Sequence, residues 1–181
     1  MEVRSAPPIV STNEGLRLLA SSVGHEFELA VRLGLQLGAS LDELAELLWE
    51  DVHTTEAVIA LRGSSSPGRR RRVPLPPRLV DLLRRHKASP AEEVVSRRVR
   101  DRLRLGFPGW AKSAAGRPVS FGELSRAFPV LLLTHGVPVL VVMELVGRPA
   151  VTPATYVDGA PVGVQARAAV SLLEAHLYGD R

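Results

Sequence analysis

Apolar residues recur along most of the chain at the three-to-four-residue spacing of amphipathic helices. Ser11 and Thr12, with the nearby Glu14, resemble the N-cap of a first helix, and Ser40 can cap a third. After the first helix, the predicted helical segments are Glu26 to Leu37, Leu41 to Leu48, Arg78 to His86, Ala91 to Leu105, Phe121 to Thr134, Pro138 to Val146 and Val164 to Leu177. The pattern therefore predicts a mainly helical chain.

Two short segments interrupt this pattern and read as strands. Residues Ala57 to Leu61 and Arg71 to Leu75 flank a loop of glycine, serine and proline, Gly63 to Gly68, which predicts an antiparallel hairpin. The segment Gly106 to Val119, rich in glycine, proline and basic residues, is predicted to be a loop. The expected fold class is mainly α with a small antiparallel β-hairpin sheet, in one domain over residues 11–181 that follows an extended segment, residues 1–10.

Length and composition narrow the class of protein. A chain of 181 residues, 45% hydrophobic and 23% charged, can build a core and is no disordered polyelectrolyte. The absence of cysteine excludes a disulfide scaffold and thiolate chemistry, and it fits the cytoplasm, the expected location. The stretch Phe128 to Val146 contains prolines, a histidine and a glutamate, so no membrane span is expected. The five histidines lack metal-ligand spacing, so neither a metal nor a cofactor is expected.

Positive charge is concentrated in the middle of the chain. Residues 61–126 hold 17 Lys or Arg and 5 Asp or Glu, a balance of +12, within a total of +4. Such clustering indicates a polyanion-binding surface, and arginine suits bidentate phosphate contacts. The run Arg69 to Arg72 beside the hairpin tip is the strongest candidate. The arginines of the predicted helix Ala91 to Leu105 point around most of its circumference, so this helix should not be deeply buried, and Glu92, Glu93 and Asp101 offset part of their charge.

Four elements follow one another in a diagnostic order. The first is the segment Leu37 to Val52, in which a Gly-Ala-Ser turn leads to Leu-Trp-Glu-Asp-Val, and the second is the strand Arg71-Arg72-Val73-Pro74-Leu75. The third is the segment from His135-Gly136-Val137-Pro138 to Gly147-Arg148, and the fourth is Tyr156. Together they resemble the catalytic domain of the tyrosine recombinases, the phage integrase and Xer-type enzymes. The resemblance spans Ser11 to Leu177. It implies the fold of that domain, with the separate N-terminal DNA-clamp (core-binding) domain expected to be absent.

The resemblance implies a DNA-cleaving chemistry, and the residues at the matching positions imply that this chain has lost it. In such recombinases a tyrosine attacks a DNA phosphate, and a cluster of basic residues stabilises the developing charge. Tyr156 occupies the place of the nucleophile, one residue closer to Gly147 than is usual. The positions that match the basic cluster hold Ser40, Ser64, Gly122, Ser125 and Arg148. Because losing one preorganised donor costs about 10² to 10³ in rate, this pattern predicts a pseudoenzyme.

The sequence therefore favours a degenerate recombinase that binds duplex DNA without cleaving it, as a regulator or accessory partner of an active recombinase. It would associate with the nucleoid when bound. The candidate DNA-binding residues are Arg62, Arg69, Arg70, Arg71, Arg72, Arg126 and Arg148.

Two alternatives stay open. One is a divergent active recombinase in which Tyr156 cleaves, with Arg126, Arg148 and the run Arg69 to Arg72 replacing the missing cations. The other is a protein-interaction module whose basic surface meets an acidic partner. The segment Val164 to Leu177 could pack between copies of the chain, although folding back on its own domain is the default expectation. Trp49 is expected in the core, whereas the sequence leaves the burial of Trp110 undecided.

Overall fold

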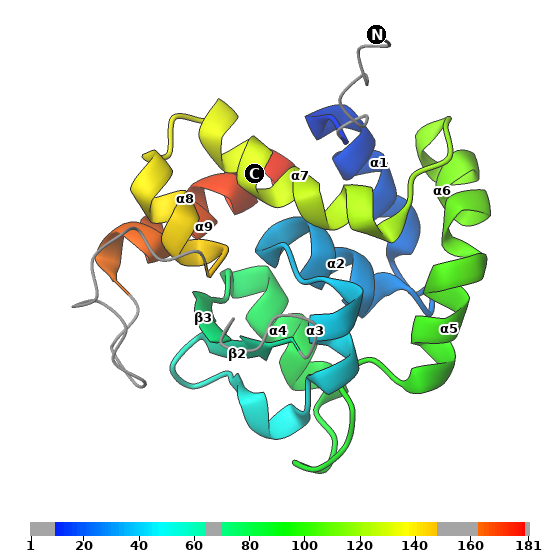
Figure 1. The fold of residues 1–181 in the computed structure, drawn as a ribbon, viewed down its shortest axis with the longest axis horizontal. Coiled ribbons are helices and arrows are strands. Elements are labelled where there is room, and N and C mark those ends of the chain that lie inside the picture. The colour runs from blue at the N-terminus through cyan, green and yellow to red at the C-terminus, as the bar shows by residue number, and fades with distance from the viewer. Residues whose placement is uncertain (1–9, 64–69, 148–162, 180–181) are drawn as a thin grey trace, which may run out of the picture.

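Helix α2 (Glu28–Leu37) lies in the middle of the computed structural model and is surrounded by other helices (Figure 1). The structure describes residues 10–63, 70–147 and 163–179. The other elements, in chain order, are α1 (Thr12–Ser22), α3 (Leu41–Glu46), the 3₁₀ helix η1 (Trp49–Asp51), β1 (Val52–His53), β2 (Val58–Arg62), β3 (Arg70–Pro74), α4 (Pro77–His86), α5 (Arg97–Leu105), α6 (Phe107–Ala115), α7 (Phe121–Thr134), α8 (Val139–Leu145) and α9 (Val164–Tyr178). This mainly helical fold with a small antiparallel sheet confirms the predicted fold class.

Local capping chemistry sets the early helix boundaries. At α1, the Ser11 hydroxyl accepts from Glu14 N at 3.3 Å while the Glu14 carboxylate accepts from Ser11 N at 2.8 Å. Ser40 and Glu43 form the same reciprocal pair at α3. α2 ends at Gly38, whose φ of 64° is the left-handed conformation that favours glycine. The predicted caps are confirmed, although α2 begins two residues later than predicted.

The described residues form a three-stranded antiparallel sheet in the order β1-β2-β3. Ile59 of β2 lies opposite Val73 of β3, and Leu61 lies opposite Arg71. The predicted antiparallel hairpin is confirmed, with each strand displaced by one residue toward the turn between them. β1 was not predicted, because its two residues are too few to show an alternating pattern in the sequence. Val52 of β1 pairs with Ile59 on the side of β2 that faces away from β3.

The predicted helix Ala91 to Leu105 is wrong in its first part. The backbone just before α5 pairs instead with the chain that follows α3, because Trp49 N donates to Glu92 O at 3.0 Å and Val94 N donates to Leu47 O at 3.1 Å. These long-range bonds satisfy backbone groups that a helix would otherwise pair locally. The helix therefore begins only at Arg97.

The predicted loop Gly106 to Val119 is also wrong, because most of it forms α6. Pro108 lies in the first turn, where a missing N–H costs little, and Gly116 ends the helix with a φ of 88°. Phe107, Ala111 and Ala115 form a buried stripe at a spacing of four residues. Proline and glycine, which favoured a loop in the sequence, here mark the two ends of a helix. α3 in turn ends at Glu46, two residues earlier than predicted.

Two glycines let α2 and α7 approach closely. A Cβ at position 34 would lie 2.9 Å from Phe121 Cζ, and a Cβ at position 38 would lie 2.9 Å from Phe128 Cδ1. α7 therefore packs its aromatic side chains directly onto the α2 backbone. The prediction that Trp49 is buried is confirmed. α7 and α8 contain the most apolar stretch of the sequence, yet none of the described helices is long and apolar enough to cross a membrane.

α9 packs against its own domain, in contact with α1, α2, α7, α8 and β3. Its buried residues are Ala166, Ala169, Val170, Leu173 and Leu177. Tyr178 fixes the end of the helix, because its hydroxyl accepts hydrogen bonds from Gln36 Nε2, at 2.8 Å, and from Arg32. The Arg78 guanidinium lies over the Tyr178 ring, 4.4 Å from its centre. Burial raises the pKa of the Tyr178 hydroxyl, which keeps it protonated at neutral pH.

A buried ion pair joins four elements of the fold. The Arg71 and Glu43 side chains are 1% and 2% exposed, and Arg71 Nε donates to Glu43 Oε1 at 2.9 Å. The other four N–H groups of Arg71 meet Glu43 Oε2 and the backbone carbonyls of Leu37, Gly38 and Leu145. Arg71 thereby ties β3 to the end of α2, to α3 and to α8.

Removing one partner of this pair should leave a buried charge without compensation. Arg71→Met or Glu43→Gln is expected to lower the free energy of unfolding by about 3–5 kcal/mol. Arg72→Ala, which removes a partly exposed partner of Glu56, serves as the control and should cost less than about 1 kcal/mol. Urea denaturation measures both. Equal costs for Arg71→Met and Arg72→Ala would show that the buried pair does not hold the elements together.

A second ionic contact joins the starts of α1 and α7. Arg117 Nε donates to Glu14 Oε1 at 2.5 Å, and Arg117 Nη1 donates to Glu123 Oε1 at 3.2 Å. Burial opposes ionisation of both carboxyl groups, but the capping N–H of Ser11 or Ser120 and the Arg117 guanidinium outweigh it and hold both pKa values below the ordinary value. Arg117 thus bridges two helix caps.

The lowered pKa values of Glu14 and Glu123 predict how this contact depends on pH. Their contribution is present above the unfolded pKa, near 4.5, and is lost as pH falls through the lower folded pKa. Arg117→Ala should therefore cost up to about 1 kcal/mol at neutral pH and nothing once both carboxyl groups are protonated. Urea denaturation at a series of pH values checks this, with exposed Arg98→Ala as the control. A difference that stays constant with pH would contradict it.

Candidate functional site

The fold brings two of the predicted site positions together at the start of α3. Ser125, on α7, donates from its Oγ to Ala39 O at 2.7 Å and lies 3.0 Å from Phe121 O. Ala39 directly precedes Ser40, whose hydroxyl accepts from Glu43 N at 3.2 Å. α7 and the N-terminus of α3 therefore meet at positions 40 and 125, which lie far apart in the sequence.

Neither serine supplies a positive charge at this meeting point. The Ser125 hydrogen is committed to backbone carbonyls in the interior, and the Ser40 hydroxyl completes the cap of α3. A serine hydroxyl is also too short to reach a ligand as an arginine side chain would. These positions stabilise the fold, and they offer no cation with which to hold a phosphate.

Gly122 and Arg126 lie one helical turn apart on α7. Arg126 is exposed, and its Nη1 lies 3.4 Å from the point that a Cβ at position 122 would occupy. The Arg126 side chain therefore runs back along α7 and covers Gly122. A side chain at position 122 would compete with the guanidinium for this space, so the glycine makes room for it.

Arg71 does not lie on the exposed surface assumed for the arginine run. Its five N–H groups all have acceptors inside the protein, so none is left for a DNA phosphate. The physical reason is strand alternation, because successive side chains of β3 point to opposite faces of the sheet. Arg70 and Arg72 flank Arg71 and point to the other face. Because side chains alternate between the two faces of a strand, the predicted strand was itself a signal that Arg71 and its two neighbours point to opposite faces.

The hairpin still carries arginines that reach solvent. The Arg62 side chain is 47% exposed and pairs with Asp51, which is buried. Arg72 pairs with Glu56 at 3.0 Å, and the Glu56 side chain is 62% exposed. Arg70 is exposed and lies opposite Arg62 in the ladder. Arg62, Arg70 and Arg72 therefore form the exposed basic part of the hairpin within the described residues.

Four predicted site residues, Ser64, Arg69, Arg148 and Tyr156, lie outside the described residues. Within the described ranges, no group of three or more histidine, aspartate or glutamate side chains could hold a metal ion. The fold does bring two histidines together, since the rings of His135 and His176 lie 3.9 Å apart, centre to centre. Trp110, undecided from the sequence, is half-buried against Phe27 and Phe107.

Neither the protein-family models nor the curated proteins compared with this chain give a match. Solved structures do match. An integrase from mycobacterium phage Brujita aligns with 100% of this chain and 62% of its own, at a TM-score of 0.75 and 20% identity. The XerA recombinase aligns with 81% of this chain and 58% of its own, at a TM-score of 0.66 and 19% identity.

A third solved structure, a lambda integrase dimer bound to a COC′ core site, aligns with 82% of this chain and 60% of its own, at a TM-score of 0.56 and 18% identity. This chain thus spans about three fifths of the length of each of the three proteins. At such identities the likeness concerns the fold. The chain has the fold of a tyrosine recombinase catalytic domain, as its motifs predicted.

Proposed function

We propose that this chain binds duplex DNA without cleaving it, as a regulator or accessory partner in DNA recombination. The proposal rests on the side chains found at positions 40 and 125. The resemblance to tyrosine recombinases assigns both to phosphate-clamping arginines, and here they are serines whose hydroxyls are bonded within the fold. Positions 40 and 125 meet in the fold, and neither side chain carries a charge.

The number of cationic side chains that are missing from the family positions supports an inactive site. Phosphoryl transfer by a tyrosine depends on preorganised donors, and removing a single one costs about 10² to 10³ in rate. Ser40, Gly122 and Ser125 remove three such donors at once. Even if their effects are far from additive, little transition-state stabilisation is left for a nucleophile at Tyr156.

The exposed arginines of the hairpin support DNA binding. Arg72 pairs with the exposed carboxylate of Glu56, and such a surface pair is worth little and exchanges readily for phosphate. Arg62 pairs with the buried Asp51, but its own side chain is 47% exposed. Arg70 lies opposite Arg62 in the ladder and two residues from Arg72 on the same face of β3, and guanidinium groups bind phosphate oxygens two at a time. The lambda integrase neighbour is bound to a core site, which makes duplex DNA the ligand to test first.

One observation favours a second candidate, a divergent active recombinase. The Arg126 guanidinium covers Gly122, at the position that the resemblance assigns to a catalytic histidine. In this alternative Arg126 stabilises the phosphate charge while Tyr156 attacks. The two candidates differ in whether a covalent protein–DNA bond forms.

DNA binding through the hairpin should depend steeply on salt, because phosphate contacts release counterions. Arg70→Ala with Arg72→Ala should weaken duplex binding and reduce the slope of log affinity against log salt by about 2. The matched control, Arg17→Ala with Lys112→Ala, removes the same charge from α1 and α6 and should leave the slope nearly unchanged. Fluorescence anisotropy with a labelled duplex gives both quantities. A flat slope, or equal losses in the two double variants, would overturn hairpin binding.

The absence of cleavage is tested with a nicked suicide duplex, which traps a covalent intermediate if one forms. We expect no adduct that survives denaturing electrophoresis. An adduct that is present in the native chain and lost in Tyr156→Phe would instead establish the second candidate. In that case Arg126→Ala should reduce the rate of adduct formation about 10²-fold or more.

A further inference from the structure

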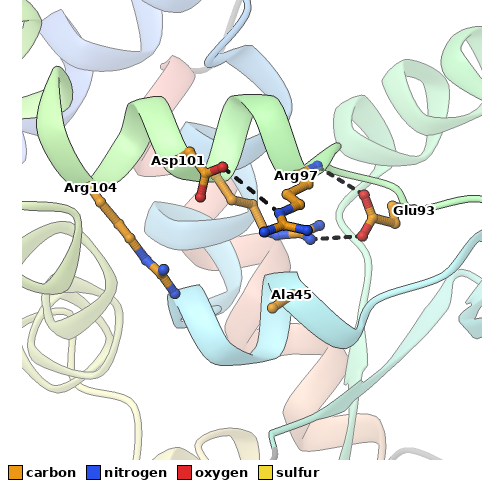
Figure 2. A pocket seen from close by; sticks show the side chains of 6 residues that line it. Ala45, Glu93, Arg97, Asp101 and Arg104 are labelled. Carbon is orange, nitrogen blue, oxygen red and sulfur yellow. Dashed lines mark hydrogen bonds and ion pairs between the residues drawn. The ribbon is translucent and has the colours of Figure 1, made fainter.

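A groove between α3 and α5 is lined by arginines and lies outside the hairpin. It encloses about 370 Å³ and is lined by Ala45, Glu93, Arg97, Arg100, Asp101 and Arg104. The three arginines follow one another at spacings of three and four residues, which places them on one face of α5. In Figure 2 this face of α5 is turned toward α3, with Ala45 on the opposite wall.

One arginine of the groove is held in place by its neighbours. Arg100 Nη2 donates to Glu93 Oε1 at 2.7 Å, its Nη1 donates to Val95 O, and the side chain is only 11% exposed. The Arg100 hydrogen bond is the main cause that lowers the pKa of Glu93, so this carboxylate stays charged. Glu93 also accepts from Arg97 N at 2.8 Å, which fixes the first turn of α5.

The other two arginines are available to a ligand. Arg97 lies 4.0 Å from Asp101, and both side chains are largely exposed, so this pair is weak. Arg104 contacts no carboxylate among the described residues, and in Figure 2 its side chain extends across the groove toward α3. The groove therefore holds one fixed, one weakly paired and one unpaired guanidinium.

Ala45 gives the groove its depth. A longer side chain at this point of α3 would extend into the space between the two helices, whereas a methyl group leaves it open. α3 also links the groove to the site described above, because Ser40 caps the helix on which Ala45 lies. The groove is thus a concave surface that shares α3 with that site and takes its cations from α5.

We propose that the α3–α5 groove is a phosphate-binding site, with Arg104 and Arg97 as the residues that contact the phosphate and Arg100 as a fixed cation behind them. Guanidinium groups suit this ligand because they bind phosphate oxygens bidentately. The phosphate belongs either to a nucleic-acid backbone or to a free polyphosphate, for which inorganic pyrophosphate is the probe. The site stands apart from the proposed function, because pyrophosphate binding is measured without DNA.

Calorimetric titration with pyrophosphate tests the site. Arg104→Ala should weaken binding about tenfold, as should Ala45→Leu, which fills the groove without changing its charge. Asp101→Asn should strengthen binding, because it frees Arg97. The matched control is Arg98→Ala, which removes an exposed arginine of the same helix from outside the groove and should change affinity less than about twofold. Circular dichroism verifies that each variant is folded.

The same variants then identify the source of the phosphate. If Arg104→Ala weakens duplex binding more than Arg98→Ala does, the site takes a nucleic-acid backbone. If it weakens pyrophosphate binding alone, the site takes a free polyphosphate. Failure of the native chain to bind pyrophosphate, or equal losses in Arg98→Ala and Arg104→Ala, would overturn the site. If the chain binds pyrophosphate but not duplex DNA, the result would count against the proposed function and would still support the phosphate site in the groove.

Discussion

The contact between Arg71 and Glu43 is the constraint on which the arrangement of the other elements depends. It places an ionised pair in the interior, where each charge must be matched by the other and by hydrogen bonds. The matching groups come from the ends of α2 and α8 and from the first turn of α3. These segments lie far apart in the sequence, so the pair fixes where the hairpin meets the helices that frame the candidate site.

The same contact also positions α3 without a charged side chain at position 40. Glu43 completes the cap formed by Ser40 and accepts from Arg71 at the same time. Ser125 adds a bond from α7 to the backbone just before that cap. Interior hydrogen bonds therefore hold this part of the fold, and the side chains at positions 40 and 125 carry no charge.

Much of the fold could be predicted from sequence, because local chemistry decides it. Ser11 and Ser40 indicated two helix caps, and two strand-like segments around a loop of glycine, serine and proline indicated the hairpin. One error arose where distant contacts override local preference, because residues before Arg97 pair with the chain after α3. The other arose because Pro108 and Gly116, which favoured a loop, mark the two ends of α6. At the site, sequence located Ser40 and Ser125, but the burial of Arg71 depends on partners from three other segments.

We propose above that this domain binds DNA without cleaving it. The most direct measurement divides one incubation of the protein with a labelled nicked duplex between a native gel and a denaturing gel. We expect a complex that shifts the duplex in the native gel, weakens with added salt and leaves no labelled protein band after denaturation. A labelled band that survives denaturation and requires Tyr156, or the absence of any shift at low salt, would contradict it.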